Sequence, residues 1–157
     1  MQINALAFDH GAPIPERFTD DGIDASPALS WRALPEGTRA LALIVDDPDA
    51  PRDEPFVHWL AWNIPVEEDN LQEGLPRKGE LSSPGGMRQG KNSFSEQNVG
   101  YRGPAPPEGH GTHHYHFRLF ALDDTLDLPA GADRQALEQA MRSHVLDSCD
   151  CVGTYER

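Results

Sequence analysis

An uninterrupted apolar run, Leu41-Ala42-Leu43-Ile44-Val45, constrains the fold of this chain more than any other stretch of the sequence. A strand covered by protein on both faces carries apolar residues at every position, whereas a half-exposed strand alternates. The run ends directly at the acidic segment Asp46-Asp47-Pro48-Asp49. We therefore expect a central β-strand with a carboxylate-rich turn at its C-terminal end.

Two further segments have the patterns of β-strands. Residues 56–64 are rich in aromatic and branched side chains and stop at Pro65. A period of two would place Phe56, His58, Leu60 and Trp62 on one face of that strand. Residues 113–121 alternate, which predicts a core face of His113, Tyr115, Phe117, Leu119 and Ala121, with His114, His116 and Arg118 opposite.

The rest of the chain predicts one helix, one more strand and many turns. Asp133 is a good N-cap for an apolar stripe that continues to Val145, so we expect a helix over residues 133–145. Alternation after this helix predicts a last strand with Cys149 and Cys151 on one face, where they are poorly placed to bond each other. Residues 1–40 are interrupted by proline and glycine too often for an ordinary helix, which favours short strands and turns.

Residues 77–99 have no clean period. They are rich in Gly, Ser, Asn and Gln, with Pro84-Gly85-Gly86 in the middle, so we expect a long loop. Long loops in compact domains are often functional, and a plain solvated connection is the alternative. The candidate role of this loop is to cover a pocket.

Size and charge narrow the classes of function. A chain of 157 residues is expected to form a single domain over residues 1–157. Its 26 acidic and 13 basic residues give a formal net charge of −13, which opposes binding to nucleic acid and stable attachment to an anionic membrane. No signal peptide and no membrane-spanning run is visible, so we expect a soluble, cytoplasmic protein. We expect no cofactor and no metal, and exposed strand edges make a homodimer plausible.

The acidic turn and the predicted strands bring chemistry-bearing residues together. Asp47 and Asp49 flank Pro48, which stiffens the backbone from which both carboxylates project. A histidine can hold an anion by N–H donation, and a neighbouring carboxylate orients the ring. The turn from Gly103 to Pro107 offers a rigid wall with main-chain donors at Gly103 and Ala105 only, because proline has none. Each element alone is more often structural than functional.

Their joint occurrence resembles a known family. The motifs Asp47-Pro48-Asp49-Ala50-Pro51, His58-Trp59, Gly103-Pro104-Ala105-Pro106-Pro107 and Gly111-Thr112-His113-His114-Tyr115 are similar to those of the phosphatidylethanolamine-binding proteins, also called Raf kinase inhibitor proteins. The resemblance extends from Phe18-Thr19-Asp20-Asp21-Gly22 to the ending Gly153-Thr154-Tyr155-Glu156-Arg157. The length resembles the bacterial and archaeal YbhB-like branch.

The resemblance implies a mainly β fold in which a large antiparallel sheet packs on a smaller one, with a few short helices, one of them near the C-terminus. It also implies a small anion-binding cavity at the end of the sheet. Carried over residue by residue, the ligand-binding positions are Asp47, Asp49, Phe56, His58, Gly103, Pro106, Pro107, His113 and Tyr115. Longer eukaryotic members continue into a C-terminal helix that borders the pocket, so we expect a wider mouth here.

The function we expect is non-catalytic binding of a small anion, such as phosphate, a phosphoethanolamine-like compound or a carboxylate, with modulation of an unidentified protein partner as an extension. One alternative is a hydrolase, either an acid–base enzyme using Asp47 with His58 or a metal-dependent one. The metal-dependent version would draw on Asp49, His110, His113, His114 and His116. A third class is a protease or kinase inhibitor module with residues 77–99 as its contact surface.

Overall fold

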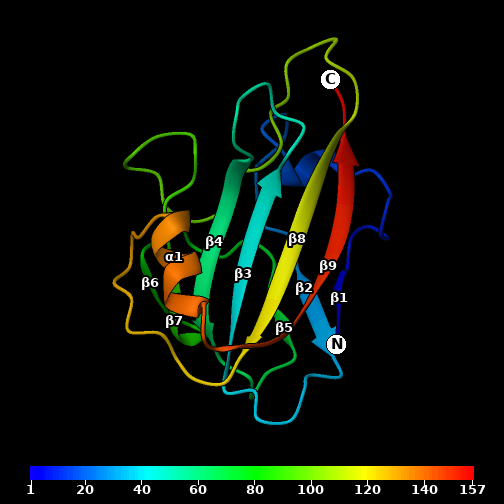
Figure 1. The fold of residues 1–157 in the computed structure, drawn as a ribbon. Coiled ribbons are helices and arrows are strands. Elements are labelled where there is room, and N and C mark those ends of the chain that lie inside the picture. Colours follow the sequence, from blue (N-terminus) through cyan, green and yellow to red (C-terminus); the bar gives the residue numbers. More distant parts are fainter.

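The computed structural model describes residues 1–157 and shows two antiparallel sheets with one α-helix (Figure 1). In chain order the elements are β1 (Gln2–Ala5), η1 (Glu16–Phe18), β2 (Leu29–Arg32), β3 (Ala40–Asp47), β4 (Phe56–Ile64), β5 (Asn70–Leu71), β6 (Glu80–Ser82), β7 (Gly85–Gln89), β8 (His113–Leu122), α1 (Arg134–Met141) and β9 (Val145–Tyr155). The large sheet has the order β6-β7-β4-β3-β8-β9, and the small sheet has the order β1-β2-β5. The predicted fold class is confirmed.

Strand β3 is the central strand that its apolar run predicts. It pairs with β4 on one side and β8 on the other, and all its residues are buried. Leu41, Leu43 and Val45 pack in a core between the two sheets. Ala42 and Ile44 pack in a second core beneath α1. Both faces are covered, which is why the run needs no polar position.

Helix α1 is shorter than its sequence pattern predicts. Asp133 is the N-cap as expected, and its carboxylate accepts a hydrogen bond from the Ala136 N–H at 2.9 Å. The helix ends at Met141 because the chain must turn and join β9, whose first residue Val145 pairs with Leu122 of β8. No helix in the structure has both the length and the apolar character needed to cross a membrane.

The predicted long loop over residues 77–99 is wrong in its first half, where β6 and β7 form a hairpin. Strand β7 extends the large sheet by pairing with β4. The two strands are short and carry glycine and polar residues, so they leave no periodic signal. The second half, residues 90–99, does form a loop apart from an isolated bridge between Lys91 and Val99.

Strand β4 contains a β-bulge that the period-two prediction misses. Val45 pairs with Trp59 while Asp46 pairs with Val57, so His58 is an extra residue with no partner of its own. A bulge of this kind re-aims the side chains that precede it. Leu60 and Trp62 consequently pack beneath α1, whereas the His58 ring lies 5.2 Å from the Tyr115 ring. The expectation that His58, Leu60 and Trp62 share a face is therefore wrong.

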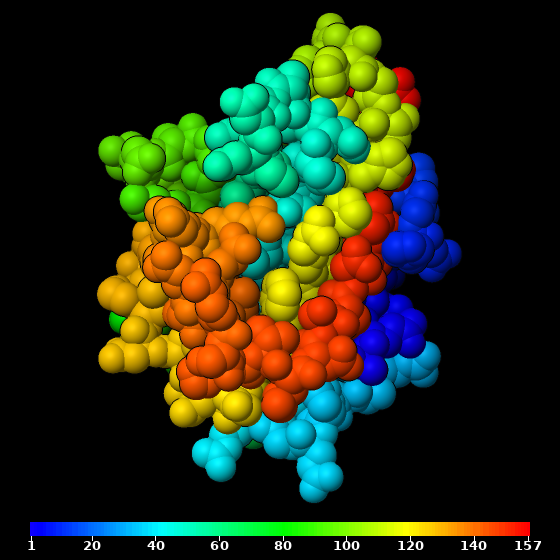
Figure 2. All heavy atoms as spheres, viewed as in Figure 1, coloured from blue at the N-terminus to red at the C-terminus, as the bar shows by residue number.

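One end of the large sheet collects the loops that build the site. The β3–β4 loop, the loop after β7 and the segment before β8 all lie there (Figure 1). Helix α1 covers part of the sheet below them and leaves the outer surface of β8 and β9 visible beside it (Figure 2). The last strand has Cys151 buried and Cys149 packed beside the same core, and both thiols are free, as the alternation predicts.

Candidate functional site

A hollow of about 520 Å³ opens at this end of the sheet, between the ends of β3, β4 and β8. Its lining residues come from these strands, the β3–β4 loop, the loop after β7 and the segment before β8. They are Asp47, Ala50, Pro51, Arg52, Phe56, His58, Ser93, Phe94, Ala105, Pro107, His113 and Tyr115. The structure thus brings together these predicted site residues: Asp47, Phe56, His58, Pro107, His113 and Tyr115.

Asp47 and His113 form a buried pair in the floor of the hollow. The carboxylate is 3% exposed and the imidazole 1% exposed. The Nδ1 of His113 lies 2.6 Å from Oδ2 of Asp47, and the other carboxylate oxygen accepts the Asp49 N–H at 2.9 Å. Both oxygens of Asp47 are therefore engaged within the protein, and Asp47 orients His113.

His110 is the second partner of His113, although the sequence predicts it only as a ligand in the metal-dependent alternative. Its Nδ1 lies 2.7 Å from Nε2 of His113. Since the Asp47 carboxylate only accepts, the Nδ1 of His113 carries a proton, and its Nε2 shares another with His110. Neither ring nitrogen of His113 is free to donate to a ligand in this arrangement.

His58 is tied to the segment before β8 by its bulged position. Its Nδ1 donates to the Arg102 carbonyl oxygen at 2.6 Å, and its own carbonyl oxygen accepts the Arg102 N–H at 3.0 Å. The rings of Phe56, Phe94 and Tyr115 surround it with centroids 5.0, 5.6 and 5.2 Å away. Burial lowers the pKa of His58, although the Arg102 carbonyl and the Asp47 carboxylate oppose that shift. The ring is therefore neutral at neutral pH.

The hydroxyl of Tyr115 is the one site group that is buried without a partner. It makes no hydrogen bond of normal geometry within the protein, and the residue is 1% exposed. Burial raises the pKa of Tyr115, and the negative charge of Asp47 raises it further, so the hydroxyl keeps its proton. Buried polar groups are normally hydrogen-bonded, which makes this phenol a donor in need of an acceptor.

Three predicted site residues lie outside the lining of the hollow. Asp49 accepts hydrogen bonds from the main chain and Nδ1 of His114 on the outer face, both at 2.8 Å. The N–H of Gly103 is already donated to Asp24 Oδ1 at 2.7 Å, so it is not available to a ligand. Pro106 is buried and does not line the hollow. These residues shape the loops that surround the hollow.

Among the lining residues that were not predicted as part of the site, Arg52 contributes a positive charge to the hollow, and Ser93 and Phe94 form part of its wall. Arg52 comes three residues after Asp49 of the acidic turn, and its guanidinium lies 5.4 Å from the centroid of the Phe56 ring. Ser93 and Phe94 come from the loop that was expected to cover a pocket. In the sequence, only the short distance of Arg52 from the acidic turn could have indicated a role in the site. Residues 90–99, which contain Ser93 and Phe94, have no pattern that predicts a pocket.

The remaining histidines of β8 do not join the hollow. His114 and His116 point to the outer face, where they pair with Asp49 and Asp150 at 2.8 and 3.1 Å. His113 points to the opposite face of the same strand, as alternation requires. No group of three or more His, Cys, Asp or Glu side chains is arranged to hold a metal ion.

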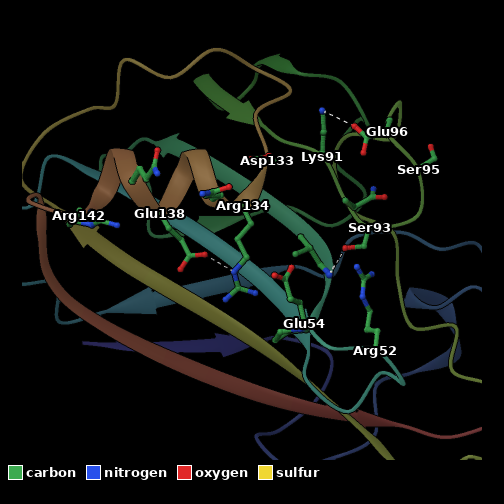
Figure 3. Close-up of a pocket in the computed structure, with 15 residues that line it drawn as sticks. Arg52, Glu54, Lys91, Ser93, Ser95, Glu96, Asp133, Arg134, Glu138 and Arg142 are labelled. Carbon is green, nitrogen blue, oxygen red and sulfur yellow. Dashed lines mark hydrogen bonds and ion pairs between the residues drawn. The ribbon is translucent and has the colours of Figure 1, made fainter.

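A second, larger hollow of about 960 Å³ adjoins the first and shares Arg52 and Ser93 with it. It lies between α1, the β3–β4 loop and the loop after β7 (Figure 3). Many of its charges pair with one another, as in Lys91 with Glu96 at 3.0 Å and Arg134 with Glu138 at 2.9 Å. The smaller hollow, with its buried histidines and unpaired phenol, is the better candidate for a specific ligand site.

The sequence of this chain is similar to those of known proteins over nearly its whole length. The sequence model for phosphatidylethanolamine-binding proteins matches residues 4–156. The UPF0098 protein of Pyrococcus abyssi is 49% identical over 150 residues, which cover 96% of this chain and 82% of the relative. The UPF0098 protein of Methanothermobacter thermautotrophicus is 44% identical over 157 residues, which cover 100% of this chain and 99% of the relative.

Two solved structures share the fold over nearly the whole chain. A phosphatidylethanolamine-binding protein homologue from Chlamydia trachomatis superposes with a TM-score of 0.86 at 33% identity, covering 99% of this chain and 96% of the other. YbcL of Escherichia coli, described as a member of the mammalian PEBP family, gives a TM-score of 0.91 at 27% identity, covering 99% and 98%.

Because Asp47 is buried, we expect it to stabilise the folded state more than the exposed Asp49 does. Asp47→Ala removes two hydrogen bonds to a buried carboxylate, so the free energy of unfolding should fall by about 3 kcal/mol. Asp49→Ala is the matched control, because its pair with His114 is roughly half exposed and should contribute below about 1 kcal/mol. Urea denaturation of both variants measures the difference, and equal losses would contradict the assignment.

Gly103 has a packing role that a methyl group would disrupt. A Cβ at this position would lie 2.1 Å from the Phe18 carbonyl oxygen, so Gly103→Ala should cost about 3 kcal/mol of unfolding free energy. Gly85→Ala is the control, since its nearest neighbour to a Cβ is 3.5 Å away, and it should change stability by less than about 0.5 kcal/mol. Thermal unfolding distinguishes the two, and a Gly103→Ala protein as stable as wild type would contradict this role.

The buried neutral state of His58 predicts a pH dependence of stability. Its folded-state pKa lies below the ordinary value of 6.5, so the unfolded chain takes up this proton first as pH falls. The free energy of unfolding should therefore decrease as pH drops below about 6.5. The His58→Gln variant lacks this titrating group, so its stability should not fall with pH for this reason. The free energy by which wild type is more stable than His58→Gln should therefore become smaller as the pH is lowered. His144→Gln, at a surface position, is the control, and a difference independent of pH would contradict the prediction.

Proposed function

Because this chain belongs to the phosphatidylethanolamine-binding protein family, we propose that it is a non-catalytic binding protein whose smaller hollow holds the anionic group of a small ligand. The ligand group we propose is a phosphate or a carboxylate, with phosphoethanolamine-like compounds among the candidates. The observation that carries this proposal is the buried hydroxyl of Tyr115, which makes no hydrogen bond of normal geometry within the protein although the Asp47 carboxylate is nearby.

The electrostatics of the hollow support a small anion. Arg52 stands at the rim and makes no salt bridge, so its positive charge is available to a ligand. Ala105 also lines the hollow, and its main-chain N–H makes no hydrogen bond with the protein. These groups act locally against the overall charge of −13, which repels an anionic bilayer. A small solute is thus a better fit than a membrane surface.

The hydroxyl groups of the hollow favour binding over catalysis. The Oγ of Ser93 accepts the Val57 N–H at 2.8 Å and makes no hydrogen bond to His58. A serine nucleophile needs a base within hydrogen-bond reach, and this serine has none. Tyr115 keeps its proton because burial raises its pKa, so it suits donation to a ligand oxygen. Non-catalytic recognition accounts for both groups.

Tyr115→Phe tests the proposed function. Calorimetric titration of wild type with phosphate, phosphoethanolamine and acetate at about pH 6 to 7.5 should detect binding of at least one of them. Removing a donor to a charged acceptor should weaken that binding by about tenfold or more. The variant should remain as stable as wild type, because the hydroxyl bonds nothing in the protein.

Tyr101→Phe is the matched control. Its hydroxyl is also buried, but it donates to the Phe18 carbonyl oxygen at 2.6 Å and does not line the hollow. This variant should lose about 1 kcal/mol of stability and keep its affinity for the anion. Absence of binding by wild type to all three compounds would overturn the proposed function, as would unchanged affinity in Tyr115→Phe.

A further inference from the structure

The hydrogen bonds around His58 define which of its nitrogens faces a ligand and what that nitrogen can do. A carbonyl oxygen cannot donate, so the contact of 2.6 Å to Arg102 requires the proton to be on Nδ1. In the neutral ring Nε2 then carries a lone pair and acts as an acceptor. Nε2 makes no hydrogen bond within the protein, while the ring lines the hollow. The hollow therefore offers an acceptor to its ligand at this point.

The charged groups around His58 do not change that state at neutral pH. Asp46 and Asp47 of β3 and Asp24 act to favour its protonation, but burial outweighs them and lowers the pKa. His113 and Tyr115 face it from β8, and the latter keeps its own proton. The Arg102 side chain pairs with Asp24 at 3.2 Å, and Arg52 is the cation at the rim. His58 therefore remains neutral.

The donors that remain free in the hollow complete the pattern. They are the Tyr115 hydroxyl and the Arg52 guanidinium at the rim, because His113 is used by Asp47 and His110. Ala105 also lines the hollow, and its N–H makes no hydrogen bond within the protein. One acceptor beside these donors matches an anion that carries one proton and at least two bare oxygens. The negative charge of Asp47 in the floor also disfavours a ligand with two negative charges.

Building on the proposed function, we propose that His58 makes the site specific for a phosphate monoester in its singly protonated form. The P–OH of the ligand donates to Nε2 of His58, and its bare oxygens accept from Tyr115, Ala105 and Arg52. The proton on the ligand is thus the feature that the site recognises.

This arrangement disfavours anions that lack the proton of the monoester, relative to the singly protonated phosphate group. Sulfate, a carboxylate and a phosphodiester carry no proton at neutral pH, so each would place a lone pair against the lone pair of Nε2. A monoester has a second pKa of about 6 and retains a protonated fraction near neutrality. The lipid form of phosphoethanolamine is a diester, so the site favours the free monoester over the lipid headgroup.

Titration with matched anions tests the specificity. The probes are methyl phosphate, dimethyl phosphate, sulfate, phosphoethanolamine and glycerophosphoethanolamine. Methyl phosphate should bind at about pH 6 with an affinity about tenfold to a hundredfold higher than sulfate or dimethyl phosphate. Its affinity should fall about 15-fold between about pH 6 and about pH 7.5, as the protonated fraction falls. Sulfate does not titrate in this range and reports any change in the protein itself.

The two ethanolamine compounds separate the phosphate proton from the ammonium group as the donor to His58. Phosphoethanolamine and glycerophosphoethanolamine share the ammonium, but only the first has a P–OH. We expect glycerophosphoethanolamine to bind as weakly as dimethyl phosphate. Equal binding of the two ethanolamine compounds would overturn the proposal, because the ammonium would then be the recognised group.

A variant and a spectroscopic measurement test the role of His58 directly. In His58→Gln the amide can turn either its oxygen or its nitrogen to the hollow, so the preference for methyl phosphate over sulfate should fall towards one. His144→Gln, which removes a surface histidine paired with Asp123, should leave the preference unchanged. The ¹⁵N chemical shifts of His58 at neutral pH should show Nδ1 protonated and Nε2 bare, and they test the proposal even if the glutamine variant does not fold.

The outcomes separate this inference from the proposed function. Equal affinity for methyl phosphate and sulfate, or a protonated Nε2 at neutral pH, would overturn the specificity and leave anion binding intact. Failure of all five probes, and of inorganic phosphate and acetate, to bind would overturn the proposed function and the specificity together. A preference for the monoester that follows its protonation supports both.

Discussion

The central strand ends in two adjacent buried carboxylates. The surrounding structure has to provide hydrogen-bonding or charged partners for both of them. Asp46 is 0% exposed and Asp47 is 3% exposed. Neighbouring residues of a strand point to opposite faces, so each carboxylate needs its own partners. A buried charge without a partner costs several kcal/mol, and this cost explains why distant parts of the chain converge on β3.

The two carboxylates organise different layers of the molecule. On the helix side, Arg134 reaches Asp46 at 2.7 Å and Arg118 reaches it at 3.2 Å, which fixes the start of α1 and the outer face of β8. On the other side, Asp47 holds His113, whose second nitrogen contacts His110. Pairing Asp46 stabilises the scaffold. Pairing Asp47 arranges the floor of the hollow and uses the donors of His113 in doing so, so the ligand recognition that we propose falls to His58, Tyr115, Ala105 and Arg52.

The sequence predicted the regular parts of this architecture well. The apolar run of β3, the alternation of β8 and the N-cap at Asp133 each depend on local pattern, and each is confirmed. The bulge at His58 was not predictable, because the extra residue is visible only in the pairing of β4 with β3. The β6–β7 hairpin and the early end of α1 also depend on contacts with distant residues, which local periodicity does not record.

The sequence by itself determined the mainly β fold, the family resemblance and the placement of His113 and Tyr115 on the core face of a strand, whereas Asp47, expected in a turn, is the last residue of β3. These features follow from residue type and spacing along the chain. Only the tertiary structure decided that Asp49 bonds His114 and that Gly103 bonds Asp24, both outside the hollow. It also decided that His110 bonds the second ring nitrogen of His113 and that the Tyr115 hydroxyl is left without a partner. Hydrogen bonding at a buried site depends on which donors and acceptors meet across the fold, and their meeting depends on strand register and loop closure.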